Sequence, residues 1–354
     1  MNSLVKKKRL SNIEALRILA MFLVLVVHAD FFTFGGPTIE LYTENSTFAL
    51  GQYFFEALSI CCVNIFVLIS GWFGIRPNKK GFFNLVFQCL FFLFGIYIFC
   101  LITGMADYSL KGYLKGIAGC FVLLKWNWFI KAYICLYIIS PILNAYVEKA
   151  SKHDFMYMLI AFFSFQTIYS WITGAAVFFE GGYSTISFMG LYLLARYVKL
   201  YPNKLTTLSY NTDLLIFCLS VIVFTGVSYV SVAAATNIHS KFLFFSGIMY
   251  SYVNPIVILM SLYILLFFSK IPFSNKYVNW LGASSFAVFL LHTNPNLCKP
   301  CFCQHILYFG NLFNGIGFLF VVLSYLIFVF LLAVMIDQIR LFLWKKISNT
   351  SYLS

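Results

Sequence analysis

Residues 12–29 read NIEALRILAMFLVLVVHA, an apolar stretch long enough to cross a bilayer as a helix. Three ionisable side chains interrupt it: Glu14, Arg17 and His28. Such groups are costly in hydrocarbon, so they mark a candidate functional site. Arg17 and His28 are eleven positions apart, which is almost three turns at about 3.6 residues per turn. Both side chains therefore leave the helix on one face, about 16 Å apart along its axis.

This shared face predicts one wall of an active site inside the membrane, with a cation near one surface and an imidazole toward the other. Each residue also has a plainer interpretation. Arg17 can extend to lipid headgroups, and His28 can be a hydrogen-bonded interior histidine. The pair favours the site, because two unrelated features would otherwise have to align by chance.

The composition predicts an all-α, polytopic membrane protein. Of the 354 residues, 62% are hydrophobic, 20% aromatic and only 10% charged, which is more apolar surface than a soluble domain needs. The net charge of +13 does not predict a nucleic-acid partner, because the basic residues are scattered between apolar segments and suit short cytoplasmic loops. No signal-peptide cleavage site follows the basic run at residues 6–9, so the first span is expected to remain as an anchor.

About ten spans are expected in a single domain over residues 1–354, with short basic cytoplasmic tails around a bundle at 13–336. The expected spans are residues 13–34, 52–75, 82–104, 129–147, 155–173, 183–198, 212–234, 252–269, 277–297 and 316–336. With the N-terminus inside, seventeen of the 24 Lys and Arg residues fall on the inner side and six on the outer side. This agrees with the positive-inside rule and places both termini in the cytoplasm, Arg17 toward the cytoplasm and His28 toward the outside.

The spacing of Arg17 and His28, with an acid three positions before the arginine, resembles the first-helix signature of the membrane-bound acyltransferase 3 family. Members of that family O-acylate bacterial surface glycans. Its acid is usually Asp, where this chain has Glu14. The resemblance implies that His28 is catalytic and Arg17 essential, in a protein of the bacterial cytoplasmic (inner) membrane. It also implies an acyl-CoA co-substrate such as acetyl-CoA, no permanently bound cofactor, and a glycan or lipid-linked sugar acceptor.

The second expected span ends in a Ser70-Gly71 pair, which resembles the family's second-span ending and allows close helix approach. A basic cluster of Arg76, Lys79 and Lys80 follows. It either sets the topology or binds the phosphates of the acyl-CoA donor, since clustered cations complement phosphate. The family often has Arg at both ends of a four-residue motif here, where this chain has Arg76 and Lys79. We assign the cluster and Ser70 to the donor.

Polar and aromatic side chains of the second, fourth and ninth expected spans are assigned to the acceptor or to the support of its site. Tryptophan is also typical of membrane interfaces, lysine can extend outward, and histidine can pack at an interface. The fourth-span Trp-Phe pair with a later Tyr resembles the family's glycan-modifying members, and the ninth span resembles its late helix of Gly, Ser, an aromatic and His. The residues are Asn64, Trp128, Lys131, Tyr133, Ser284 and His292.

Cys298, Cys301 and Cys303 lie close to His305 and superficially resemble a metal site. A second pair of ligands is missing, so no metal is expected. In an oxidising outer compartment, a disulfide is the stronger expectation.

The predicted reaction moves an acyl group from the thioester to a sugar hydroxyl, with His28 as general base and Glu14 orienting Arg17. An alternative is a transporter or flippase for a lipid-linked sugar or acyl metabolite, in which the intramembrane Arg and His bind substrate or couple protons. A glycan polymerase is a third possibility, but it predicts large outer loops rich in Arg and acids, whereas these loops are short to medium.

Overall fold

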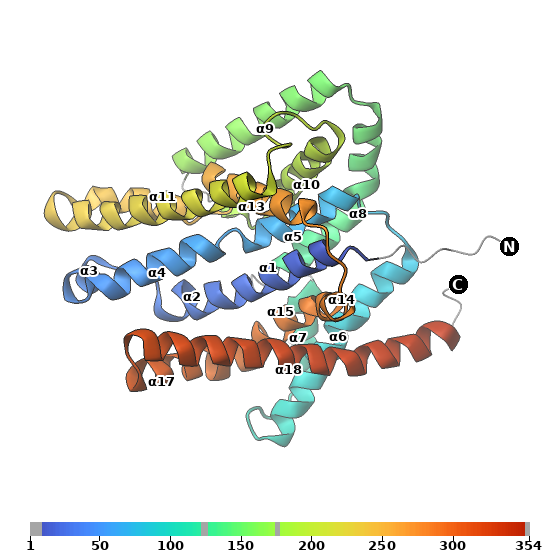
Figure 1. Ribbon diagram of the computed structural model, residues 1–354. Coiled ribbons are helices and arrows are strands. Elements are labelled where there is room, and N and C mark those ends of the chain that lie inside the picture. The colour runs from blue at the N-terminus through green and yellow to red at the C-terminus, as the bar shows by residue number, and fades with distance from the viewer. Residues whose placement is uncertain (1–8, 122–126, 174–177, 351–354) are drawn as a thin grey trace.

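The computed structural model describes residues 9–121, 127–173 and 178–350. These residues are helical, without a strand among them, and the long helices form a bundle (Figure 1), which confirms the predicted all-α membrane fold. The longer helices are α1 (Ser11–Ala29), α4 (Ser46–Ser59), α5 (Cys62–Phe73), α6 (Lys79–Ile102), α7 (Leu110–Phe121), α8 (Trp128–Lys149), α9 (Lys152–Thr173), α10 (Thr185–Leu200), α11 (Tyr210–Asn237), α13 (Pro255–Lys270) and α18 (Gly315–Thr350). The shorter ones are α2 (Phe31–Phe34), α3 (Ile39–Glu44), α12 (Leu243–Met249), α14 (Lys276–Ala283), α15 (Ser285–His292), α16 (Pro295–Leu297), α17 (Gln304–Leu312), and the 3-10 and π segments η1 (Glu180–Gly182), η2 (Ser240–Phe242) and η3 (Cys298–Cys303).

Seven helical segments of the described chain are long and apolar enough to cross a membrane, and all seven match expected spans. The other three expected spans are shorter or broken. Residues 183–198 form α10 and 252–269 form α13, each with 16 residues. Residues 277–297 form α14 and α15, which are separated at Ser284. The segments long enough to cross are Ser11–Phe34, Ser46–Phe73, Lys79–Ile102, Trp128–Lys149, Lys152–Thr173, Tyr210–Asn237 and Gly315–Ser348.

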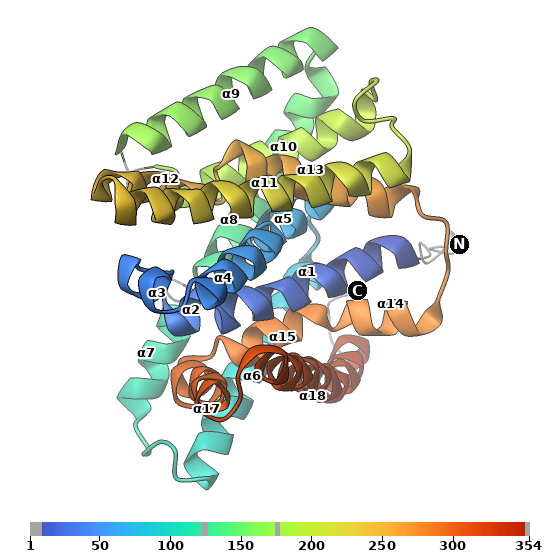
Figure 2. The same ribbon diagram turned by 60° about the vertical axis from the view of Figure 1, so that its left-hand side comes forward.

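Helix α1 runs through the middle of the bundle (Figure 2), where it packs against α4, α5, α13, α14, α15 and α18. Its leucines, valines and alanines are largely buried in this contact. Because neighbouring helices surround α1, its ionisable side chains face protein on several sides. The start of α1 and the end of α18 lie at one end of the bundle (Figure 1), as expected if both termini lie on one side of the membrane.

Close approach of α5 and α10 depends on Gly71. A Cβ at this position would lie 2.3 Å from the Tyr192 carbonyl oxygen, so only glycine fits without a shift. The helix contact expected at Ser70-Gly71 is therefore present. It fixes α10 beside the turn at residues 74–78 that follows α5.

A buried ionic network joins α6 to α18. Arg340 donates from Nε to Asp337 Oδ1 at 2.8 Å and from Nη2 to Asp337 Oδ2 at 2.9 Å. Asn84 and Gln88 on α6 complete the network, since Asn84 Oδ1 accepts from Arg340 and Gln88 Nε2 donates to Asp337. The charges are thus paired and hydrogen-bonded, as buried charges must be.

Candidate active site

An ion pair lies at the start of α1. Arg17 Nη1 donates to Glu14 Oε1 at 2.7 Å, and Arg9 Nη1 donates to the same oxygen at 3.2 Å. The Glu14 side chain is 4% exposed and the Arg17 side chain 33% exposed. The expected contact between Glu14 and Arg17 is present. One buried carboxylate therefore fixes the orientation of Arg17.

Arg17 lines a cavity of about 370 Å³ between α1, α5, α6 and α8. The cavity brings Arg17 together with Ser70 and Arg76, two of the residues assigned to the donor. Lys79 and Lys80 are exposed at the start of α6 and are not among its lining residues. The polar side chains in the lining are Arg17, Ser70, Arg76, Asn78, Tyr133 and Tyr137. Cations, hydroxyls and an amide around one cavity suit an anionic, hydrogen-bonding ligand.

Tyr133 was assigned to the acceptor, but the structure places it in this cavity. Its Oη lies 3.3 Å from Ser70 Oγ, and its ring stacks on Phe129. Tyr133 therefore lies beside Ser70, a residue assigned to the donor, and not in a separate acceptor site. The sequence does not reveal this, because the contact depends on how α8 packs against α5.

Hydrogen bonds from neighbouring helices hold the turn at residues 74–78. The Ile75 N–H donates to Tyr192 Oη at 3.0 Å, and that hydroxyl donates to Asn144 Oδ1 at 2.6 Å. Asn144 Nδ2 returns a bond to the Ile75 carbonyl at 2.8 Å. Tyr137 Oη accepts from the Asn78 N–H at 2.8 Å and donates to the Asn78 carbonyl at 3.0 Å. The backbone beside Arg76 is therefore preorganised, a feature that the sequence does not indicate.

At the other end of α1, His28 contacts a second histidine. His28 Nδ1 lies 2.9 Å from Nε2 of His292, a residue 264 positions later in the chain. His292 is 2% exposed, and its Nδ1 lies 2.5 Å from the Val288 carbonyl oxygen one turn earlier on α15. Both histidines were predicted to lie on the same side of the membrane, but the direct contact was not predicted.

The contacts of this histidine pair determine its proton positions. A carbonyl oxygen only accepts, so His292 Nδ1 carries the proton in that bond and the neutral ring has an unprotonated Nε2. That nitrogen must then accept from His28 Nδ1–H. Neutral His28 consequently keeps its own Nε2 without a proton. A histidine held in one tautomer with a free Nε2 is suited to remove a proton from a substrate.

Arg17 and His28 share a helix face, but His28 is not among the residues that line the Arg17 cavity. Met21 and Val24 lie on the stripe between them, and both are buried. The cavity and the histidine pair are therefore two sites on one face of α1, with two apolar side chains between them.

Comparison with protein families gives a match over nearly the whole chain. The model described as an acyltransferase domain, that of the acyltransferase 3 family, covers residues 10–338. The chain belongs to the acyltransferase 3 family. No curated protein and no solved structure matches it. The protein is therefore an acyltransferase with several membrane-competent helices, and the transporter and polymerase alternatives are set aside.

Two residues assigned to the acceptor meet through Tyr252 of the enzyme. Asn64 Nδ2 donates to the Tyr252 carbonyl at 2.9 Å. The Trp128 ring lies 6.1 Å from that of Tyr252 and 4.5 Å from that of Tyr183, between centroids. The acyltransferase thus has an aromatic cluster where the second and fourth expected spans meet.

Two other residues assigned to the acceptor are Ser284 and Lys131. Ser284 is buried between α14 and α15, where its Oγ accepts from Gln338 Nε2 at 2.9 Å. This bond ties the helix break to α18. Lys131 is half-buried on α8.

The cysteines of η3 are free thiols, with Cys298 and Cys303 buried. The expected disulfide is therefore not formed in the structure, where all three cysteines lie within one short π-helical segment. Among the described residues, no group of three or more His, Cys, Asp or Glu could hold a metal ion.

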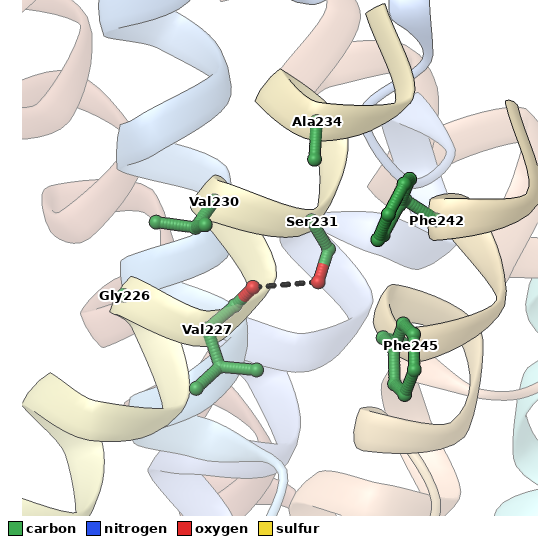
Figure 3. Close-up of a pocket in the computed structure, with 7 residues that line it drawn as sticks. All are labelled: Gly226, Val227, Val230, Ser231, Ala234, Phe242 and Phe245. Carbon is green, nitrogen blue, oxygen red and sulfur yellow. Dashed lines mark hydrogen bonds between the residues drawn. The ribbon is translucent and has the colours of Figure 1, made fainter. Parts of the chain in front are cut away.

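A second cavity, of about 410 Å³, lies between α11 and the η2–α12 segment (Figure 3). It is apolar, and the Oγ of Ser231, the one hydroxyl in its lining, donates to the Val227 carbonyl at 2.7 Å. Phe242 and Phe245 face this hydroxyl from the other wall. No ionisable side chain lines the cavity, so it lacks groups for acyl transfer.

Proposed function

We propose that the enzyme transfers an acyl group, in the simplest case acetyl, from cytoplasmic acyl-CoA to a hydroxyl of a cell-surface or lipid-linked glycan. His28 is the general base, and the cavity at Arg17 and Arg76 holds the donor. The enzyme would act in the bacterial inner membrane. The observation that carries this proposal is the hydrogen-bonded pair of His28 and His292, which leaves His28 Nε2 unprotonated on the helix face that also bears Arg17.

In the proposed reaction, His28 carries one proton from the acceptor hydroxyl to the coenzyme thiolate. The acceptor hydroxyl oxygen attacks the thioester carbonyl carbon while His28 Nε2 takes the hydroxyl proton. The carbon–sulfur bond then breaks, the acyl group stays on the acceptor oxygen, and the coenzyme thiolate takes the proton from His28. The products are an O-acylated sugar and free coenzyme A. Hydrogen bonding to His292 supports the imidazolium that forms between these steps.

Arg17 suits the donor because its guanidinium remains charged and presents several donors in a fixed plane. The ion pair with Glu14 keeps that plane in place. Arg76 adds a second cation to the same cavity, and Ser70 and Tyr133 add hydroxyls. Phosphates or the amides of the pantetheine arm of acyl-CoA would find complementary groups here.

The experiment uses purified enzyme, acetyl-CoA labelled in the acetyl group and a lipid-linked glycan, and follows the label into the glycan and the release of coenzyme A. We expect His28→Ala to lower the rate by about 10²- to 10⁴-fold, the usual contribution of a general base. His153→Ala is the matched control, because His153 is exposed at the start of α9. Transfer by folded His28→Ala at the wild-type rate would refute the base assignment. If wild type shows neither transfer nor coenzyme release with any acyl-CoA, the assignment of acyl-CoA as the donor is wrong.

A further inference from the structure

Arg196 on α10 lies beside the donor cavity, although it was not among the predicted site residues. Its guanidinium is next to Gly74, one of the residues that line the cavity. A Cβ at Gly74 would lie 3.2 Å from Arg196 Nη1 and 3.5 Å from its Cζ. Gly74 also has a φ of +74°, which favours glycine. The positive φ of Gly74 and its lack of a side chain let the Arg196 guanidinium lie against the turn.

The guanidinium of Arg196 is not neutralised within the described part of the chain. Its Nε is buried and has no hydrogen-bond partner, and Arg196 forms none of the ion pairs found there. Three other partly or fully buried cations are paired: Arg17 with Glu14, Lys270 with Asp213 and Arg340 with Asp337. A buried donor without a partner is unfavourable, and it belongs here to a half-buried cation, so the site suits an anion from outside the chain.

Arg76 provides a second cation at the same turn. It lies two residues after Gly74, lines the cavity and forms no ion pair within the described residues. Hydrogen bonds from Tyr192 and Asn144, which together we call the clamp, hold Ile75, the residue between Gly74 and Arg76. Two guanidiniums are thus attached to one rigid turn. Planar guanidinium groups pair well with phosphate oxygens, often through two bonds at once.

We propose that Arg196 binds a phosphate group of the acyl-CoA donor together with Arg76, so that the turn at residues 74–76 is the phosphate-binding element of the enzyme. This inference rests on the proposed function, because it assigns a further residue to the donor of that reaction. Arg17 lines the same cavity with its charge already balanced by Glu14, which leaves it for the pantetheine and thioester part of the donor.

The test measures binding of coenzyme A to purified enzyme by calorimetry, without any acyl transfer. We expect Arg196→Met to raise the Kd for coenzyme A by about tenfold or more, the usual effect of losing a charge-assisted hydrogen bond. Arg196→Lys should raise it less, because the charge remains and only the planar fork is lost. Lys204→Met is the matched control: it removes an exposed cation just after α10 and should leave the Kd unchanged.

A second measurement separates a phosphate contact from a structural role. Acetyl-pantetheine carries the thioester but no phosphate, so its KM should be the same for wild type and Arg196→Met, whereas the KM for acetyl-CoA should rise. An equal rise for both donors, or unchanged coenzyme A binding by a folded variant, would overturn the inference. If Arg196→Met does not fold, as judged by thermal unfolding in detergent, Arg196→Lys decides on the same measurements. Failure of wild type to bind coenzyme A would instead refute the proposed donor, and with it this inference.

Discussion

Gly282 on α14 lies directly against Glu14 on α1. A Cβ at position 282 would lie 2.5 Å from Glu14 Oε2 and 2.8 Å from the Glu14 Cβ. Glu14 in turn holds Arg17 through Oε1, while its Oε2 is buried without a hydrogen-bond partner. The absence of a side chain at position 282 is therefore what lets Glu14 occupy the position from which it orients Arg17.

Gly282→Ala should displace Glu14 and lower activity through Arg17. We expect a loss of about tenfold or more in kcat/KM for acyl-CoA, since misplacing a positioning group by about 1 Å can cost far more than this. Thermal unfolding in detergent should show only a modest loss of stability. Gly95→Ala on α6 is the control, because a Cβ there meets nothing within 4 Å. Wild-type kinetics in Gly282→Ala would show that Glu14 need not be in this position.

His292 should act through the proton position of His28. His292→Phe removes the acceptor for His28 Nδ1–H, and we expect kcat to fall by about 10²-fold, within the range of general-base effects. The KM for acyl-CoA should change little, because His292 does not line the cavity at Arg17 and Arg76. His292→Gln offers a side-chain oxygen as acceptor and should restore part of kcat. Equal kcat values for the Phe and Gln variants would contradict a hydrogen-bonding role.

Tyr192→Phe should loosen the turn that carries Arg76. The change removes only the hydroxyl that links the Ile75 N–H to Asn144. A buried N–H without an acceptor costs about 1–3 kcal/mol, so the free energy of unfolding should fall by that amount. The KM for acyl-CoA should rise more than kcat falls. Tyr263→Phe on α13 removes a comparable bond to the Leu205 carbonyl away from the cavity, and its KM should match wild type. A Tyr192→Phe enzyme with unchanged KM would show that the clamp does not shape the donor site.

The ionic network between α6 and α18 should matter for stability and not for chemistry. Asp337→Leu leaves Arg340 buried without its counter-charge, which typically costs about 3–5 kcal/mol. The double variant Asp337→Leu with Arg340→Met should recover much of this loss, because it removes both charges. Thermal unfolding in detergent measures the difference. A double variant less stable than Asp337→Leu alone would show that the network stabilises the fold by more than the mutual neutralisation of Asp337 and Arg340.

Helix periodicity was sufficient to predict the main features of α1. The eleven-residue spacing gave one face with Arg17 and His28, and the three-residue spacing gave the contact of Arg17 with Glu14. These predictions need only the geometry of a single helix. Hydropathy likewise found the long helices. It gave no sign of the break at Ser284, which depends on the local backbone and on the hydrogen bond to Gln338.

Contacts between distant segments could not be predicted in this way. The pairing of His28 with His292 depends on how α1 and α15 pack, and nothing in the spacing of either segment indicates it. Arg196 is one of the seventeen Lys and Arg residues expected on the inner side, where its charge suits the topology, and the sequence does not indicate its place beside Gly74. Tyr192 looked like an ordinary aromatic residue of an apolar helix.

Met21 and Val24 are buried on the helix face between Arg17 and the histidine pair. If coenzyme A binds near Arg17 as proposed, these two side chains lie between it and the histidines, and they would keep its thioester from water at the base. Turnover then requires these side chains to move aside. A methionine changes shape easily, which makes Met21 the side chain best able to move aside. The proposed reaction thus needs these two side chains both to separate the two ends of the helix face and to let the thioester pass.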